Sequence, residues 1–96
     1  MSASDPTRAQ AIVDICNARG LHARASAKFV KLASTFEADI RVTREGVTVN
    51  ALSIMGLLML GAGIGSAIEI AASGPDAAAA VTALGELVSA RFEEDQ

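Results

Sequence analysis

The chain has 96 residues, enough for one domain with a modest hydrophobic core. Its net charge of −3 and its lack of Trp and Tyr argue against nucleic-acid binding through phosphate contacts or base stacking. The single cysteine excludes an internal disulfide, no signal peptide is recognisable, and the longest apolar run, ALSIMGLLMLGAGIG, is shorter than a membrane span of about 20 residues. We therefore expect one cytoplasmic domain over 1–96, with flexible tails at about 1–8 and 93–96 and no membrane association.

The first predicted elements are a strand and an amphipathic helix. The β-branched residues of AQAIVDI favour a strand, and the polar segment that follows it ends the strand. Between His22 and Phe36, apolar residues recur at the spacing of one helix face. Arg24, Lys28 and Lys31 flank that face, so we expect a basic stripe that faces solvent.

Further along, two short strands are predicted at Asp39 to Thr43 and at Val47 to Asn50, joined as a hairpin. Ser53 suits the N-cap of a short helix over Ile54 to Leu60. A fourth strand is predicted in SAIEIAAS, and after a Gly-Pro-Asp turn an apolar stripe predicts a helix that runs through Phe92.

This βαββαβα order, with single and paired strands between the helices, differs from the regular alternation of a doubly wound parallel sheet. It favours the α+β class. We predict an open-faced two-layer sandwich, in which three helices cover one face of a four-stranded, mainly antiparallel sheet.

The segment GLHARAS contains the only histidine of the chain, His22, at a predicted helix start. Backbone N–H groups at a helix start lack intrahelical acceptors and the helix dipole is positive there, so an anion on the imidazole would find donors. Gly20 permits a tight turn into the helix, and Arg24 offers a planar fork of donors to phosphate oxygens. The pattern indicates an anion or phosphoryl site, although a histidine near solvent can also be merely structural. One His and one Cys are too few ligands for a metal, and we expect neither a metal nor a cofactor.

NARGLHARASAKFV resembles the active-site segment of the histidine-containing phosphocarrier (HPr) family of the bacterial phosphotransferase system, and SIMGLLML resembles that family's regulatory-serine segment. His22 and Ser53 lie 31 residues apart, as the family pattern requires. The resemblance implies an HPr-like fold in which His22 takes phosphate on Nδ1 from Enzyme I and passes it to an EIIA-type protein. Arg24 would stabilise the phosphohistidine, and the chain would be a covalent intermediate and not an enzyme. Ala25 stands where the family usually has proline, as in a GLHARAS subgroup.

The resemblance also implies that Ser53 is phosphorylated by an HPr kinase/phosphorylase, a role compatible with that of a helix cap. Leu57 and Leu60 are predicted to turn inward from the short helix. The predicted partner-binding face consists of Lys28, Ile54, Met55, Leu58 and Met59, for which ordinary core packing is the alternative. The alternative function is a non-covalent binding module that holds a small phosphorylated ligand at the His22 helix end. For a carrier, it also stays open whether the protein serves sugar uptake or a nitrogen-type regulatory branch.

Overall fold

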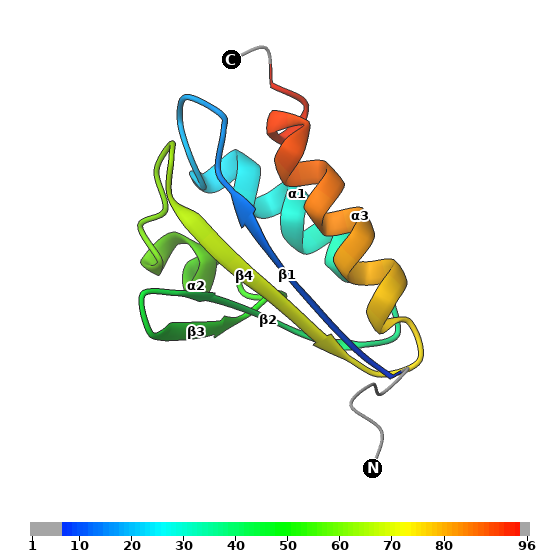
Figure 1. The fold of residues 1–96 in the computed structure, drawn as a ribbon. Coiled ribbons are helices and arrows are strands. Elements are labelled where there is room, and N and C mark those ends of the chain that lie inside the picture. The colour runs from blue at the N-terminus through cyan, green and yellow to red at the C-terminus, as the bar shows by residue number, and fades with distance from the viewer. Residues whose placement is uncertain (1–6, 95–96) are drawn as a thin grey trace.

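The computed structural model describes residues 7–94, which form one antiparallel sheet covered on one face by helices (Figure 1). The sheet has the strand order β1-β4-β2-β3, and the predicted α+β sandwich with its element order is confirmed. Within the described residues, no helix is both long and apolar enough to cross a membrane. The elements are β1 (Arg8–Asp14), α1 (Ala23–Ala33), β2 (Asp39–Arg44), β3 (Val47–Asn50), α2 (Ile54–Met59), β4 (Ala67–Ser73), α3 (Ala77–Ser89) and a 3-10 turn, η1 (Arg91–Glu93).

A single core joins the helices to the covered face of the sheet. Val42 of β2 and Ile70 of β4 are partners in the strand register, and both are fully buried. Phe29 of α1, Leu57 of α2 and Leu84 of α3 pack into the same core. Burying a side chain of this size stabilises a fold by about 1.5–3 kcal/mol. Because each helix contributes such a side chain to the same core, the core holds the helices, and with them the helix starts, in place on the sheet.

Helix α1 is shorter than the sequence predicted, since it ends at Ala33 and not at Phe36. Two hydroxyl side chains bind the carbonyl groups of its last turn. Ser34 Oγ donates to the Lys31 carbonyl at 2.7 Å, and Thr35 Oγ1 donates to the Leu32 carbonyl at 2.7 Å. Ser and Thr compete with the helical hydrogen bonds in this way, which explains the early end.

The prediction that the last helix continues through Phe92 is wrong, because α3 ends at Ser89. Arg91, Phe92 and Glu93 have φ angles of 57°, 53° and 63°, in the left-handed region. Such a backbone costs non-glycine residues about 1–2 kcal/mol each, so other contacts must hold it. One of these is Phe92 itself, whose side chain is fully buried in the core.

Parts of the expected tails, at about 1–8 and 93–96, lie within secondary-structure elements. Arg8 is the first residue of β1, and Glu93 belongs to η1. Glu94 makes side-chain hydrogen bonds, described below, to residues that precede α1. The rest of the two tails, 1–6 and 95–96, lies outside the described residues.

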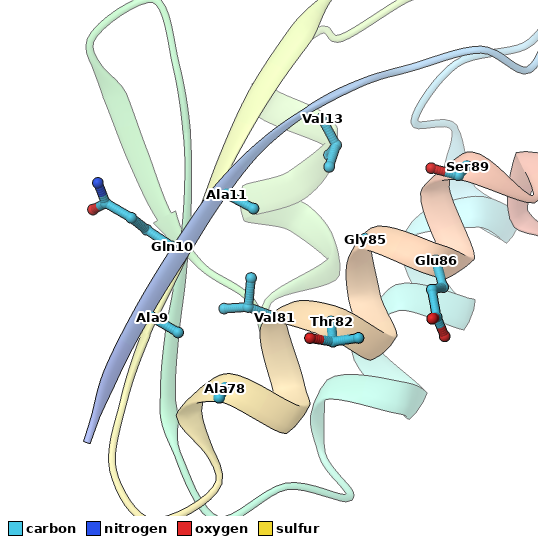
Figure 2. Close-up of a pocket in the computed structure, with 10 residues that line it drawn as sticks. All are labelled: Ala9, Gln10, Ala11, Val13, Ala78, Val81, Thr82, Gly85, Glu86 and Ser89. Carbon is cyan, nitrogen blue, oxygen red and sulfur yellow. The ribbon is translucent and has the colours of Figure 1, made fainter. Parts of the chain in front are cut away.

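An open groove of about 450 Å³ runs between the edge strand β1 and helix α3 (Figure 2). It exists because small residues face each other there, with Ala9 and Ala11 on β1 and Ala78 and Gly85 on α3. Among residues 7–94, Glu86 is the only ionisable side chain that lines it, and most of the other lining residues are small or apolar.

Candidate functional site

The sequence predicted a helix start at His22; the structure places His22 at the N-cap of α1, one position before the first helical residue, Ala23. Its backbone is extended, with φ −79° and ψ −176°, and its carbonyl accepts the first helical hydrogen bond from Ser26 N at 2.8 Å. Its ring also acts as the cap, because Nδ1 accepts a hydrogen bond from the backbone N–H of Arg24 at 3.3 Å. The imidazole therefore lies beside the backbone N–H groups of the first helical turn, which have no acceptor within the helix.

The other ring nitrogen of His22 faces a carboxylate. Nε2 lies 2.6 Å from Oε2 of Glu94, and the two side chains are 23% and 16% exposed. Nδ1 accepts a backbone N–H and so presents its lone pair, which places the proton of the neutral ring on Nε2, as donor to Glu94. In this tautomer Nδ1 is the nucleophilic atom.

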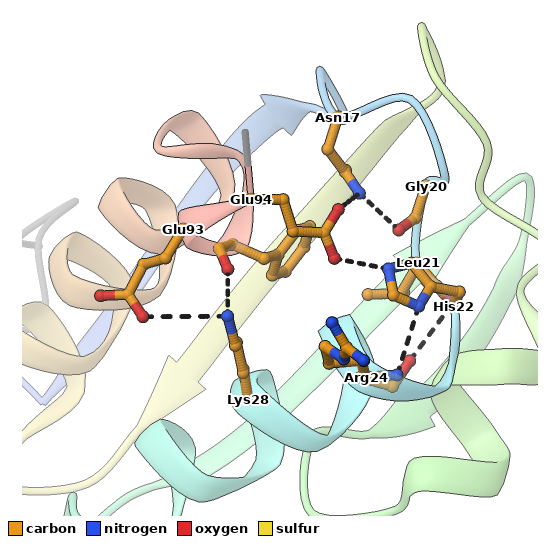
Figure 3. A network of polar contacts seen from close by, with 10 residues as sticks. Asn17, Gly20, Leu21, His22, Arg24, Lys28, Glu93 and Glu94 are labelled. Atoms are coloured by element: carbon orange, nitrogen blue, oxygen red, sulfur yellow. Dashed lines mark hydrogen bonds and ion pairs between the residues drawn. The ribbon is translucent and has the colours of Figure 1, made fainter. Parts of the chain in front are cut away.

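Glu94 is the centre of a polar network that sequence analysis missed (Figure 3). Its Oε1 accepts a hydrogen bond at 3.0 Å from Asn17 Nδ2, which also donates to the Gly20 carbonyl at 2.9 Å. Partial burial raises the pKa of Glu94, but the hydrogen bonds from Asn17 and His22, together with the positive charge of Arg19, outweigh it and lower the pKa overall. Glu94 is therefore an ionised acceptor at neutral pH.

The turn before α1 requires Gly20. Its φ is +65°, and a Cβ atom there would lie 2.5 Å from the carbonyl oxygen of Ala62. The next residue, Leu21, donates its backbone N–H to that same carbonyl at 2.8 Å. The loop that ends in His22 is thus packed against the segment that follows α2, and the predicted tight turn is present.

The predicted basic stripe on α1 is only partly open to solvent. Arg24 and Lys31 are exposed, and within residues 7–94 the Arg24 guanidinium has no hydrogen-bond or ion-pair partner. Lys28 is half-buried, because its Nζ donates to the Phe92 carbonyl at 2.7 Å and lies 4.0 Å from a Glu93 carboxylate oxygen. Arg24, two residues after His22, therefore remains available for a phosphate.

Ser53 is the N-cap of α2, as the sequence predicted, and its Oγ accepts the Gly56 N–H at 2.9 Å. Helix α2 packs against α1, but no hydrogen bond or ion pair in the described part of the chain joins Ser53 to His22. The proposed face on α2 is largely open to solvent, and the two leucines predicted inward are buried. Exposed fractions are 40% for Ile54, 69% for Met55 and 75% for Met59, whereas Leu58 is half-buried and Leu57 and Leu60 are buried.

Comparison with known proteins gives consistent matches over most of the chain. A family model described as the PTS HPr component phosphorylation site matches residues 9–90. The phosphocarrier protein HPr of Cupriavidus necator is 48% identical over 82 residues, which cover 85% of this chain and 92% of that protein. The phosphocarrier protein NPr of Shewanella violacea is 44% identical over 88 residues, which cover 92% and 97%. The crystal structure of HPr-C-His from Thermoanaerobacter tengcongensis aligns with a TM-score of 0.88 at 39% identity, covering 92% of this chain and 99% of that one.

Proposed function

This chain belongs to the HPr family of phosphocarrier proteins of the phosphotransferase system, and from this premise we propose that His22 Nδ1 is the atom that carries the phosphoryl group. One observation supports the assignment most strongly. Nδ1 lies at the N-terminus of α1 and accepts the Arg24 N–H, while the Glu94 carboxylate lies 2.6 Å from Nε2 and favours a proton on that nitrogen. A neutral ring in this tautomer needs no deprotonation before it attacks phosphorus.

In the proposed transfer, the Nδ1 lone pair attacks the phosphorus of phosphorylated Enzyme I. The phosphorus–nitrogen bond of the donor breaks, and its electron pair returns to the donor nitrogen. As the phosphoryl group arrives, the backbone N–H of Arg24 releases Nδ1 and donates its hydrogen bond to a phosphoryl oxygen instead. The Arg24 guanidinium stabilises the negative charge on the other phosphoryl oxygens. Attack by an EIIA-type acceptor reverses these steps and restores His22, so the protein is a recycled reactant and not an enzyme.

For the partners, we assign Enzyme I as donor, an EIIA-type protein as acceptor and the cytoplasm as location. The exposed apolar side chains of α2 form the proposed docking face together with Leu58 and Lys28. Met side chains adapt to differently shaped surfaces, which suits a carrier that must bind more than one partner. The ammonium of Lys28 already binds the Phe92 carbonyl, so its contribution to docking is expected to be small.

Ser53 is the proposed regulatory site, with an HPr kinase/phosphorylase as its modifying enzyme. Its hydroxyl oxygen accepts the Gly56 N–H, and phosphoryl oxygens could accept the same N–H after modification. Phosphorylation adds about −1.5 to −2 charges, which the α2 N-terminus tolerates. The effect should therefore fall on docking and not on the fold.

Intact-mass measurement after incubation with Enzyme I and phosphoenolpyruvate tests the central proposal. A carrier gains one acid-labile phosphoryl group, whereas omission of either component leaves the mass unchanged. Retention of a phosphorylated small molecule without any covalent gain would contradict the proposal and support a non-covalent binding module instead.

A further inference from the structure

We propose that Glu94 is a positioning residue for phosphoryl transfer, which holds the proton on Nε2 of His22 and thereby keeps Nδ1 as the nucleophile. The inference rests on the proposed function of His22 and adds to it a residue beyond the end of α3. Both oxygens of the carboxylate are engaged, Oε2 with His22 Nε2 at 2.6 Å and Oε1 with Asn17 Nδ2 at 3.0 Å (Figure 3). A carboxylate held at both oxygens fixes the ring orientation as well as the tautomer.

The backbone before Glu94 is shaped to bring this carboxylate to the ring. Three consecutive non-glycine residues, Arg91 to Glu93, adopt left-handed φ angles. The buried side chain of Phe92 anchors this turn, and Lys28 Nζ binds the Phe92 carbonyl at 2.7 Å. Strained backbone persists only where surrounding contacts over-determine it, and it is concentrated at functional sites.

Asn17 connects the carboxylate to the loop that precedes α1. A single amide nitrogen donates both to Glu94 and to the Gly20 carbonyl, two residues before His22. The opposite amide orientation would place Oδ1 against the carboxylate, so the network itself defines the donor. The amide oxygen, Oδ1, is buried without a hydrogen-bond partner in the described part of the chain. Such unpaired buried atoms are rare in folded proteins, so we infer that the two hydrogen bonds donated by Nδ2 determine the orientation of this amide.

The proton balance of the transfer explains why this carboxylate matters. When Nδ1 bonds to phosphorus, the ring becomes a phosphorylated imidazolium that still carries its proton on Nε2. Glu94 faces that proton with a full negative charge, so the cation is stabilised without loss of the proton. When the phosphorus–nitrogen bond breaks, the electron pair returns to Nδ1 and the original tautomer is restored. The carboxylate should therefore act on transfer in both directions.

The test compares Glu94→Gln with Glu93→Gln, the same chemical change one residue earlier. Glu93 is exposed, and its carboxylate lies 4.0 Å from Lys28 Nζ, so its loss should have little effect. Single-turnover transfer from phosphorylated Enzyme I, measured over a range of carrier concentrations, separates the rate at saturation from the apparent affinity. We expect Glu94→Gln to slow the saturated rate about tenfold or more, with affinity unchanged and Glu93→Gln near wild type.

Nitrogen-15 NMR of the His22 ring provides a second measurement that does not depend on transfer. In the wild type and in Glu93→Gln, the Nε2 proton should be protected from exchange and shifted downfield by the carboxylate, and in Glu94→Gln, whose uncharged amide oxygen is a weaker acceptor, the proton should exchange faster and move upfield. Wild-type transfer by Glu94→Gln, or slow transfer with the Nε2 signature intact, would overturn the inference. Failure of the wild type itself to accept phosphate would instead overturn the proposed function.

Discussion

The starts of α1 and α2 use the same capping position for different side chains. His22 caps α1 with an imidazole nitrogen at 3.3 Å from its amide, and Ser53 caps α2 with a hydroxyl at 2.9 Å. A hydroxyl is among the best N-caps, whereas an imidazole is seldom used as one. The long hydrogen bond between the Arg24 N–H and His22 Nδ1 is weak and easily broken. A weak capping bond leaves Nδ1 available to react.

The two starts also differ in what supports them. His22 is held from outside its helix, by Glu94 on Nε2 and by the glycine turn that packs on the Ala62 carbonyl. Ser53 is held locally, since its Oγ accepts the N–H of Gly56, a residue of its own helix. Chemistry at the first start thus depends on residues distant in sequence, whereas the second depends on its own helix.

The largest expected effect comes from removing the reactive cap. His22→Ala should abolish phosphate acceptance from Enzyme I and lower the free energy of unfolding by about 1 kcal/mol, since an N-cap is lost. His22→Asn is the matched variant, because asparagine caps well but has no nucleophilic nitrogen. It should restore stability without restoring acceptance. Intact mass and urea unfolding give the two readouts, and a labelled His22→Asn protein would exclude His22 as the acceptor.

The next largest effect concerns the turn into α1. Gly20→Ala should lower the free energy of unfolding by about 2–5 kcal/mol, because it combines a left-handed backbone with a backbone clash. Gly61→Ala is the matched control, with φ +61° and no atom within 4 Å of the added Cβ. It should cost only about 1–2 kcal/mol. Equal losses in denaturant unfolding would mean that the Ala62 contact does not fix this turn.

Arg24→Lys should slow transfer to His22 by roughly tenfold, while docking to Enzyme I stays nearly unchanged. Lysine keeps the charge but loses the planar fork that meets two phosphoryl oxygens at once. Arg41→Lys is the control, since Arg41 forms an exposed ion pair with Asp39 on β2, away from α1. Equal single-turnover rates for all three proteins would remove Arg24 from the transfer step.

The smallest expected effect is at the second helix start. Ser53→Asp should weaken association with Enzyme I by about two- to fivefold, with little change in the rate at saturation, and added salt should partly restore affinity. Gln10→Glu adds the same charge on an exposed position of β1 and serves as control. An effect of equal size in both variants would mean that net charge, and not the position of Ser53, is responsible.

Local patterns in the sequence were sufficient for the architecture. The hairpin of β2 and β3, the amphipathic face of α1 and the Ser53 cap all depend on neighbours within a few residues, so periodicity and capping preferences predict them. The end of α3 depends on something else. Phe92 continues the apolar spacing of the helix, yet it reaches the core through a left-handed turn that contains no glycine to signal it.

The candidate site was predicted only where it is local. His22 and its glycine turn could be found from GLHARAS, because a helix start is a short-range feature. Glu94 could not be found, since it meets His22 across 72 residues and lies next to other acids in a segment that reads as a polar tail. The contact that half-buries Lys28 was missed for the same reason: its acceptor, the Phe92 carbonyl, lies 64 residues away.

The turn that ends at Glu94 also has a consequence for handling the protein. A purification tag fused after Gln96 would begin three residues beyond Glu94, whose side chain contacts the histidine. The opposite terminus is better suited, because β1 carries the chain about 20 Å along the sheet from Arg8 before the loop to His22 begins (Figure 1). Activity measurements should therefore use protein tagged at the N-terminus, or protein from which the tag has been cleaved.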